Sequence, residues 1–234
     1  MTTGAELKTF ITSLNAEAAI DDTLLDVLVD NARAVLEEER PWMVLRKVNT
    51  SKTVTTSNTW ETAIDLSTIT DFSRFYSEVP VRLFDGNNRV EYYALVPFDR
   101  RLEYKDVSGT AVYDENAKTL YLNGVISFSG TLYISYISSS TAIDLTSEST
   151  VWTSFPSRFL PILGYYAVGI YKGAIDYDDI NREMLPANAE VLSALKDAME
   201  RWDSEKQHNA IEHNDPTNLY PHTRLGAVNR YEDT

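Results

Sequence analysis

Histidine is the side chain that most often moves protons near neutral pH, and this sequence has three, His208, His213 and His222. His208 and His213 lie about 140° apart around a helix, whereas a zinc-binding helix places its two histidines four residues apart on one face. No GxSxG motif presents a serine nucleophile, and the chain has no cysteine. The sequence therefore predicts no metal ligands, no cofactor-binding residues and no catalytic triad.

Two acidic stretches have the composition of calcium-binding loops. In the stretch that begins at Asp176, an EF-hand would need glycine and glutamate where the chain has Asn181 and Ala187. The cap of a helix is the better interpretation there. The second stretch, Asp85-Gly86-Asn87-Asn88, has the residue types of a hairpin turn. Glycine motifs that bind phosphate are also absent, so we expect a protein that is not an enzyme.

Composition limits the partners of the chain. The 234 residues include 35 acidic and 21 basic side chains, and the net charge of -14 repels nucleic-acid phosphates and anionic lipids. The uncharged run between Arg158 and Lys172 has 13 residues, fewer than the roughly 20 that span a bilayer. The first residues lack the pattern of a secretion signal. We expect no sequence-specific nucleic-acid binding, no membrane contact, and synthesis in the cytoplasm.

Hydrophobic periodicity predicts two helices near the N-terminus, residues 4–15 and 21–39. The second begins behind Asp21, a capping residue, and stops before Pro41. Its apolar stripe consists mainly of Leu24, Leu28, Ala32 and Val35. The opposite side is acidic, and we expect it to be solvated along its length: Asp26, Asp30, Glu37, Glu38 and Glu39.

From Trp42 to about residue 138 the sequence changes to alternating β-branched and aromatic residues, broken by turn residues. Short strands in hairpin succession predict an antiparallel sandwich or small barrel. We therefore expect an α+β protein with a discontinuous helical module, residues 1–42 and 151–207, and an inserted antiparallel β module, residues 43–150. Residues 208–234 have little periodicity and are expected to form an extended C-terminal arm.

The segment from Phe155 to Ile175 is apolar on every side, and a helix with that pattern is surrounded by protein. It is either the central helix of a monomeric bundle or a helix that neighbouring subunits cover. Because its predicted partner helices are few and short, we favour cover by identical subunits. The candidate subunit-interface residues come from this segment and from the stripe of the second helix: Leu24, Leu28, Ala32, Val35, Gly164, Tyr165, Tyr166, Gly169 and Tyr171.

The order of these parts resembles the head-to-tail connector, or adaptor, proteins of tailed bacteriophages, and the resemblance covers most of the chain. An N-terminal helix ends in Arg40-Pro41-Trp42, and a β-rich middle follows. Trp152, Phe155-Pro156 and Phe159-Leu160-Pro161 then lead into a helix with Tyr165-Tyr166-Ala167. A long amphipathic helix and a polar tail complete the pattern.

The resemblance implies a structural virion protein of the neck, which forms a ring, twelvefold by analogy, below the portal protein. Such a ring continues the DNA conduit and contacts further neck or tail proteins, and an acidic lumen would repel the passing duplex. By the same analogy the C-terminal arm docks on the portal, through Leu219, Tyr220, Pro221, Leu225 and Tyr231. The alternative is a tail or baseplate component whose β module binds a carbohydrate or host receptor through Trp60, Tyr92 or Tyr121.

Overall fold

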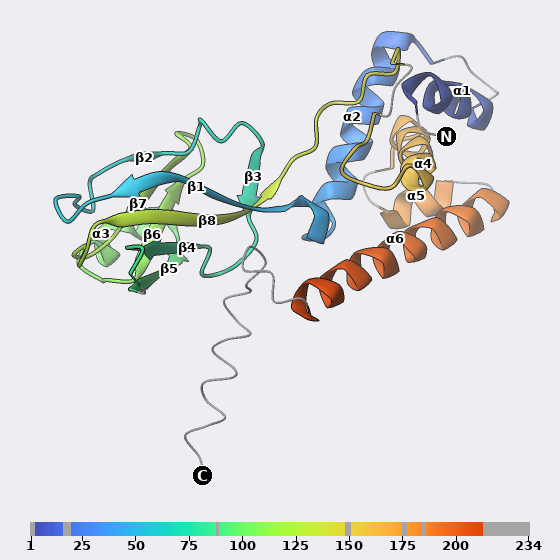
Figure 1. The fold of residues 1–234 in the computed structure, drawn as a ribbon. Helices are drawn as coiled ribbons and strands as arrows, with labels where there is room; N and C mark the ends of the chain where they lie inside the picture. The colour runs from blue at the N-terminus through green and yellow to red at the C-terminus, as the bar shows by residue number, and fades with distance from the viewer. Residues whose placement is uncertain are drawn as a thin grey trace. The chain divides into compact units, whose positions relative to one another are not determined.

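The computed structural model of the protein describes residues 3–15, 20–87, 89–147, 151–174, 177–183 and 186–212. The chain is mixed α and β and divides into two compact units (Figure 1). The helical unit takes in Met1–Leu45 and Ser139–Asn209, and the strands of the β unit lie within Arg46–Ser138. Compared with the predicted modules, the helical unit also includes residues 43–45 and the described part of 139–150.

The helices of the helical unit are α1 (Gly4–Leu14), α2 (Asp22–Glu38), α4 (Leu160–Tyr171), α5 (Tyr177–Glu183) and α6 (Pro186–Glu212). Local sequence specifies where the first two begin. A capping box formed by Thr3 and Glu6 precedes α1, and the carboxylate of Asp21 accepts a hydrogen bond from the backbone N–H of Thr23 at the start of α2.

Helix α6 is longer than we expected. It runs to Glu212, so the first residues of the predicted arm, 208–212, are helical. Nothing in the sequence ends a helix at residue 207, because Ala210 favours a helix and the next proline is Pro216. The other predicted arm residues, including those proposed to dock on the portal, lie outside the described residues.

The β unit is one eight-stranded sheet with the order β1-β8-β4-β5-β6-β7-β2, and β3 pairs with β8 beside β4. The sheet curls into a nearly closed barrel around an apolar core (Figure 1). The strands are β1 (Arg46–Val54), β2 (Ile64–Asp65), β3 (Phe72–Phe75), β4 (Val81–Phe84), β5 (Val90–Val96), β6 (Thr110–Asp114), β7 (Thr119–Leu122) and β8 (Gly130–Ser138).

One pair of strands differs from the predicted antiparallel pattern. Strands β5 and β6 are parallel, whereas the other pairs are antiparallel. A parallel pair needs a longer connection than a tight hairpin, and a 3-10 turn followed by the short helix α3 (Arg101–Tyr104) supplies it. The predicted turn at Asp85 is confirmed, since its Oδ1 accepts hydrogen bonds from the backbone N–H groups of Asn87, at 2.7 Å, and Arg89, at 3.1 Å.

Asp71 makes the stability of the β unit depend on pH. Its carboxylate accepts hydrogen bonds from the Tyr136 hydroxyl, at 2.9 Å, and from Lys47 Nζ, at 2.5 Å. Burial by itself raises the pKa of Asp71, but the hydrogen bonds from Lys47 and Tyr136 outweigh it and hold the pKa below its usual value. A carboxyl group with a lowered pKa in the folded state stabilises the fold above its unfolded pKa, and that contribution disappears as the pH falls through the folded pKa.

Replacing Asp71 with asparagine is therefore expected to lower the free energy of unfolding of the β unit at pH 7 and to matter progressively less as the pH falls below about 4. The effect at pH 7 is modest because the side chain is partly exposed and solvent screens the charge. Urea unfolding of both chains at several pH values measures it. A difference that grows in acid would contradict the prediction.

Candidate functional site

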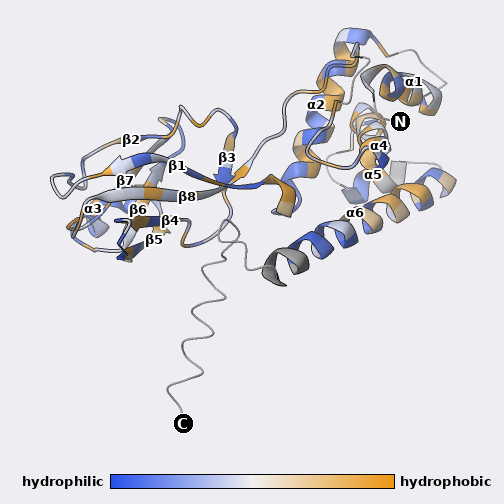
Figure 2. Cartoon of the chain, viewed as in Figure 1, coloured by the Kyte–Doolittle hydropathy of each residue, from blue (hydrophilic) through white to orange (hydrophobic). Residues whose placement is uncertain are grey.

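Helix α4 lies at the centre of the helical unit, and Figure 2 shows it mainly in hydrophobic or neutral colours. With the exception of Pro161, its residues from Leu160 to Gly169 are buried. They pack against α1, α2 and α5 of the same chain. The prediction that identical subunits cover this helix is therefore wrong for four candidate interface residues, Gly164, Tyr165, Tyr166 and Gly169. Tyr171, at the end of the helix, is exposed.

Two glycines of α4 allow this close packing. A Cβ atom at Gly164 would lie 2.7 Å from Cδ1 of Phe10, and a Cβ atom at Gly169 would lie 2.8 Å from Cγ1 of Ile180. Phe10 also packs edge-on against Tyr165, with the ring centroids 5.3 Å apart. The small residues that we expected to admit a neighbouring subunit therefore admit α1 and α5 of the same chain.

Replacing Gly169 with alanine is expected to lower the free energy of unfolding of the helical unit by about 1–3 kcal/mol, because the added methyl group overlaps the side chain of Ile180. In a chain that already carries Ile180→Ala, the same change should cost less. Urea unfolding of the four chains gives the coupling energy as a double-mutant cycle. Strictly additive losses would show that α5 does not pack on Gly169.

Helix α2 has a buried face and an exposed face. Leu28 and Ala32 of the predicted stripe are buried where α2 packs on α4, and Val35 is half-buried. Leu24 is 43% exposed, and Val27, which lies off the stripe, is 52% exposed. These two residues are three positions apart and are therefore neighbours on the helix surface. Val27 is an apolar residue outside the core stripe, and this feature of the sequence could have predicted the exposed patch.

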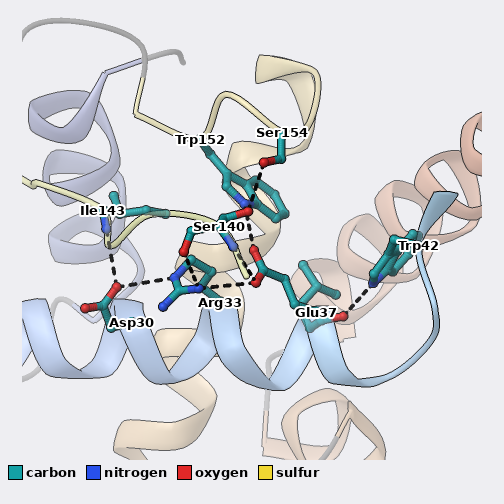
Figure 3. A network of polar contacts seen from close by, with 9 residues as sticks. Asp30, Arg33, Glu37, Trp42, Ser140, Ile143, Trp152 and Ser154 are labelled. Carbon is teal, nitrogen blue, oxygen red and sulfur yellow. Dashed lines mark hydrogen bonds and ion pairs between the residues drawn. The ribbon is translucent and has the colours of Figure 1, made fainter. Parts of the chain in front are cut away.

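The polar side of α2 binds the chain that follows β8 (Figure 3). Glu37 is buried, and its Oε2 accepts hydrogen bonds from Nη1 of Arg33, at 3.2 Å, and from the backbone N–H of Ser140, at 3.1 Å. Its Oε1 accepts a hydrogen bond from the indole N–H of Trp152, at 3.4 Å. The prediction of a solvated flank is therefore wrong for Glu37, because the chain after β8 returns to cover it.

About two turns before Glu37 on α2, Asp30 extends the same network. Its Oδ1 accepts a hydrogen bond from the backbone N–H of Ile143, at 3.3 Å, and Arg33 donates to the backbone carbonyl of Ser140, at 3.0 Å (Figure 3). Each charged group here is bonded to an opposite charge or to the backbone. The network therefore fixes the returning segment and presents no activated nucleophile.

A pocket of about 560 Å³ is lined by residues of α2, α5, α6 and the turn after α2. Nζ of Lys196 lies 2.8 Å from Oε2 of Glu39 and 3.5 Å from the ring centroid of Tyr177. The hydroxyl of Tyr166 donates a hydrogen bond to Glu39, at 2.5 Å. Burial, with Glu39 nearby, raises the pKa of Tyr166, so its hydroxyl keeps its proton. Ion pairs therefore line this pocket, and they join the turn after α2 to α6.

The aromatic residues proposed for carbohydrate binding have different surroundings. The guanidinium of Arg101 lies 5.0 Å from the ring centroid of Trp60 and 3.6 Å from that of Tyr121. Arg101 also donates a hydrogen bond to the backbone carbonyl of Trp60, at 3.0 Å. One face of each ring is therefore occupied. Tyr92, on β5, is 45% exposed.

The residues that the structure describes include many aspartates and glutamates, whose carboxylates can bind a metal ion. Within this part of the chain, no group of three or more histidine, aspartate or glutamate side chains is placed to hold a metal ion. His213, His222 and Asp176 lie outside the described residues, and the side chain of His208 is not described. Among the described helices, none is long and apolar enough to cross a membrane.

Comparison of the chain with models of known protein families gives no match, and comparison with curated proteins gives none either.

Proposed function

We propose that this chain is a head-to-tail adaptor protein of a tailed bacteriophage, a structural virion protein that forms a ring between the portal and the tail. The observation that supports this function best is that each unit exposes apolar side chains, Leu24 and Val27 on α2 and Val90 and Tyr92 on β5. A closed ring is built from heterologous contacts, which need two different surfaces on every subunit. The order of the modules resembles that of neck adaptors, and this resemblance indicates which kind of assembly the chain would form, a neck ring.

In this proposal the discontinuous helical module and the inserted β module form the body of the ring, which has twelve copies by analogy. The C-terminal arm docks on the portal, and other surfaces meet further neck or tail proteins. The role is structural, without catalysis, metal or cofactor. The net charge of -14 suits a conduit, because an acidic lumen repels the DNA that passes through it.

The portal protein of the same phage provides the test. The purified chain, mixed with portal rings, is expected to form a complex that sediments faster than either component, and electron microscopy should show added density on the tail side of the portal. Replacing Tyr220 and Leu225 of the arm with aspartate should weaken the complex. Absence of a complex across a wide range of salt and protein concentrations would contradict the proposal.

A tail or baseplate protein that binds a carbohydrate is the second candidate, and the exposure of Tyr92 favours it. Trp60 and Tyr121 support it less, because Arg101 covers one face of each ring. Binding of the chain on a glycan array that disappears in Tyr92→Ala would support this function over the adaptor.

A further inference from the structure

The outer face of strands β8, β4 and β5 carries aromatic side chains and one arginine. Successive residues of a strand point to opposite faces of a sheet. Leu83 and Leu132 are buried in the core, so Arg82 and Tyr133, which are next to them, point outward. Arg82 is the direct cross-strand partner of Tyr133 on one side and of Tyr92 on the other, so all three share the outer face.

Phe84 and Val90 extend this face. They are cross-strand partners, and the ring of Phe84 packs edge-on against Tyr133, with the centroids 5.9 Å apart. Val90 is 43% exposed, close to the 45% of Tyr92. We call five of the outward residues of these three strands the sheet face: Arg82, Phe84, Val90, Tyr92 and Tyr133.

The sheet face has no carboxylate, although the chain has 35 acidic residues. None of the outward positions of β4, β5 and β8 is aspartate or glutamate. The guanidinium of Arg82 lies 5.8 Å from the ring centroid of Tyr133 and forms no ion pair with any described residue. The sheet face therefore offers a cation and apolar rings to a partner that carries carboxylates.

The exposed face of α2 has the complementary composition. Leu24 and Val27 supply apolar surface. Asp26 lies about 100° around the helix from Val27, on the side away from Leu24; it is exposed and has no ion pair within the described residues. Asp21, Asp22 and Asp26 are exposed at this end of α2, and among the described residues only Asp22 of these three forms an ion pair, with Lys8. This part of the surface therefore has a negative potential. We call Leu24, Asp26 and Val27 the helix face.

We infer that the helix face of one copy of this chain docks on the sheet face of the next copy, an inference that rests on the proposed ring. Contacts between like faces are unfavourable, since two helix faces bring carboxylates together and two sheet faces bring Arg82 against Arg82. The heterologous contact joins apolar surface to apolar surface and a cation to carboxylates. Repeated around an axis, such a contact closes into a ring when the rotation between subunits fits.

Disulfide cross-linking tests this contact. The chain has no cysteine, so a disulfide can form only between the introduced cysteines. Val27→Cys and Tyr92→Cys chains are mixed in equal amounts and oxidised, and we expect a disulfide-linked dimer at twice the chain mass of 26.5 kDa. Each variant alone should stay monomeric on a non-reducing gel. Val125→Cys is the control, because Val125 is 77% exposed in the same unit but is not part of the sheet face.

Charge reversal gives an independent readout. Arg82→Glu places a carboxylate on the sheet face and should weaken self-association, measured by sedimentation velocity, by about tenfold or more. Arg82→Lys should associate like the unaltered chain. Lys105→Glu makes the same change of charge at another exposed position of the β unit and should also leave association unchanged. Equal association of Arg82→Glu and the unaltered chain would overturn the inference.

The docking inference and the adaptor function fail in different ways. Binding to portal rings without a mixed cysteine dimer overturns the docking inference and leaves the adaptor function in place. A mixed dimer without any portal complex supports the docking contact and overturns the adaptor function. Dimers formed by Val27→Cys alone would show contact between like faces and would overturn the docking inference.

Discussion

Replacing Glu37 with alanine is expected to lower the free energy of unfolding of the helical unit by about 3–5 kcal/mol. The carboxylate is buried and accepts hydrogen bonds from Arg33, Ser140 and Trp152. Without it, the guanidinium of Arg33 loses an ion-pair partner, and the backbone N–H of Ser140 loses its acceptor at a half-buried position. The loss should exceed that at any exposed acidic position of the same helix.

Urea unfolding followed by tryptophan fluorescence measures this effect. Trp60 belongs to the β unit and the other three tryptophans belong to the helical unit, so a Trp60→Phe background makes the signal specific. Asn31→Ala, at an exposed position of α2, is the control and should change the free energy of unfolding by no more than about 0.5 kcal/mol. Equal effects of Glu37→Ala and Asn31→Ala would contradict the structural role of Glu37.

Replacing Trp42 with alanine is expected to cost about 3–5 kcal/mol, because it leaves a cavity at the end of α2. The indole is fully buried and packs edge-on against Phe155, with the ring centroids 5.6 Å apart. Its N–H donates a hydrogen bond, at 2.7 Å, to the carbonyl of Leu36 in the last turn of α2, where backbone carbonyls lack helical partners. Differential scanning calorimetry measures the loss without relying on the fluorescence of the removed side chain.

Trp42→Phe separates packing from hydrogen bonding. Phenylalanine keeps a ring against Phe155 but cannot donate to Leu36, so its cost should be smaller than that of alanine. A phenylalanine variant as unstable as the alanine variant would show that the hydrogen bond, and not the packing of the indole, provides most of the stability. An alanine variant as stable as the unaltered chain would contradict the buried position of Trp42.

Features specified by neighbouring residues could be predicted from the sequence. Helix α2 begins where Asp21 caps it and ends before Pro41, close to the predicted bounds. The turn at Asp85 forms because its side chain accepts hydrogen bonds from the backbone of the next residues. These elements need no information from distant parts of the chain.

The cover of α4 could not be predicted in the same way. An apolar pattern on every side of a helix looks the same whether its own chain or a neighbouring subunit buries it. The cover is supplied by Phe10 on α1 and Ile180 on α5, which meet Gly164 and Gly169. That packing depends on the path of the whole chain, so the pattern indicated burial and left the identity of the cover open.

The acidic flank of α2 shows the same limit. Asp26 is exposed, as the pattern predicts, whereas Glu37 is buried on the same helix. The difference arises because Ser140 and Trp152, more than 100 residues later in the sequence, return to Glu37. A charge pattern within one helix does not reveal such a return, and the parallel pairing of β5 with β6 is also a non-local property.

A cryo-electron microscopy reconstruction of the neck of a phage that encodes this chain would test the proposed adaptor function most directly. We expect a ring of identical copies of this chain between the portal and the tail, with the helix face of each copy against the sheet face of the next. A neck ring built from another protein, with this chain elsewhere in the particle or missing from it, would contradict the adaptor function.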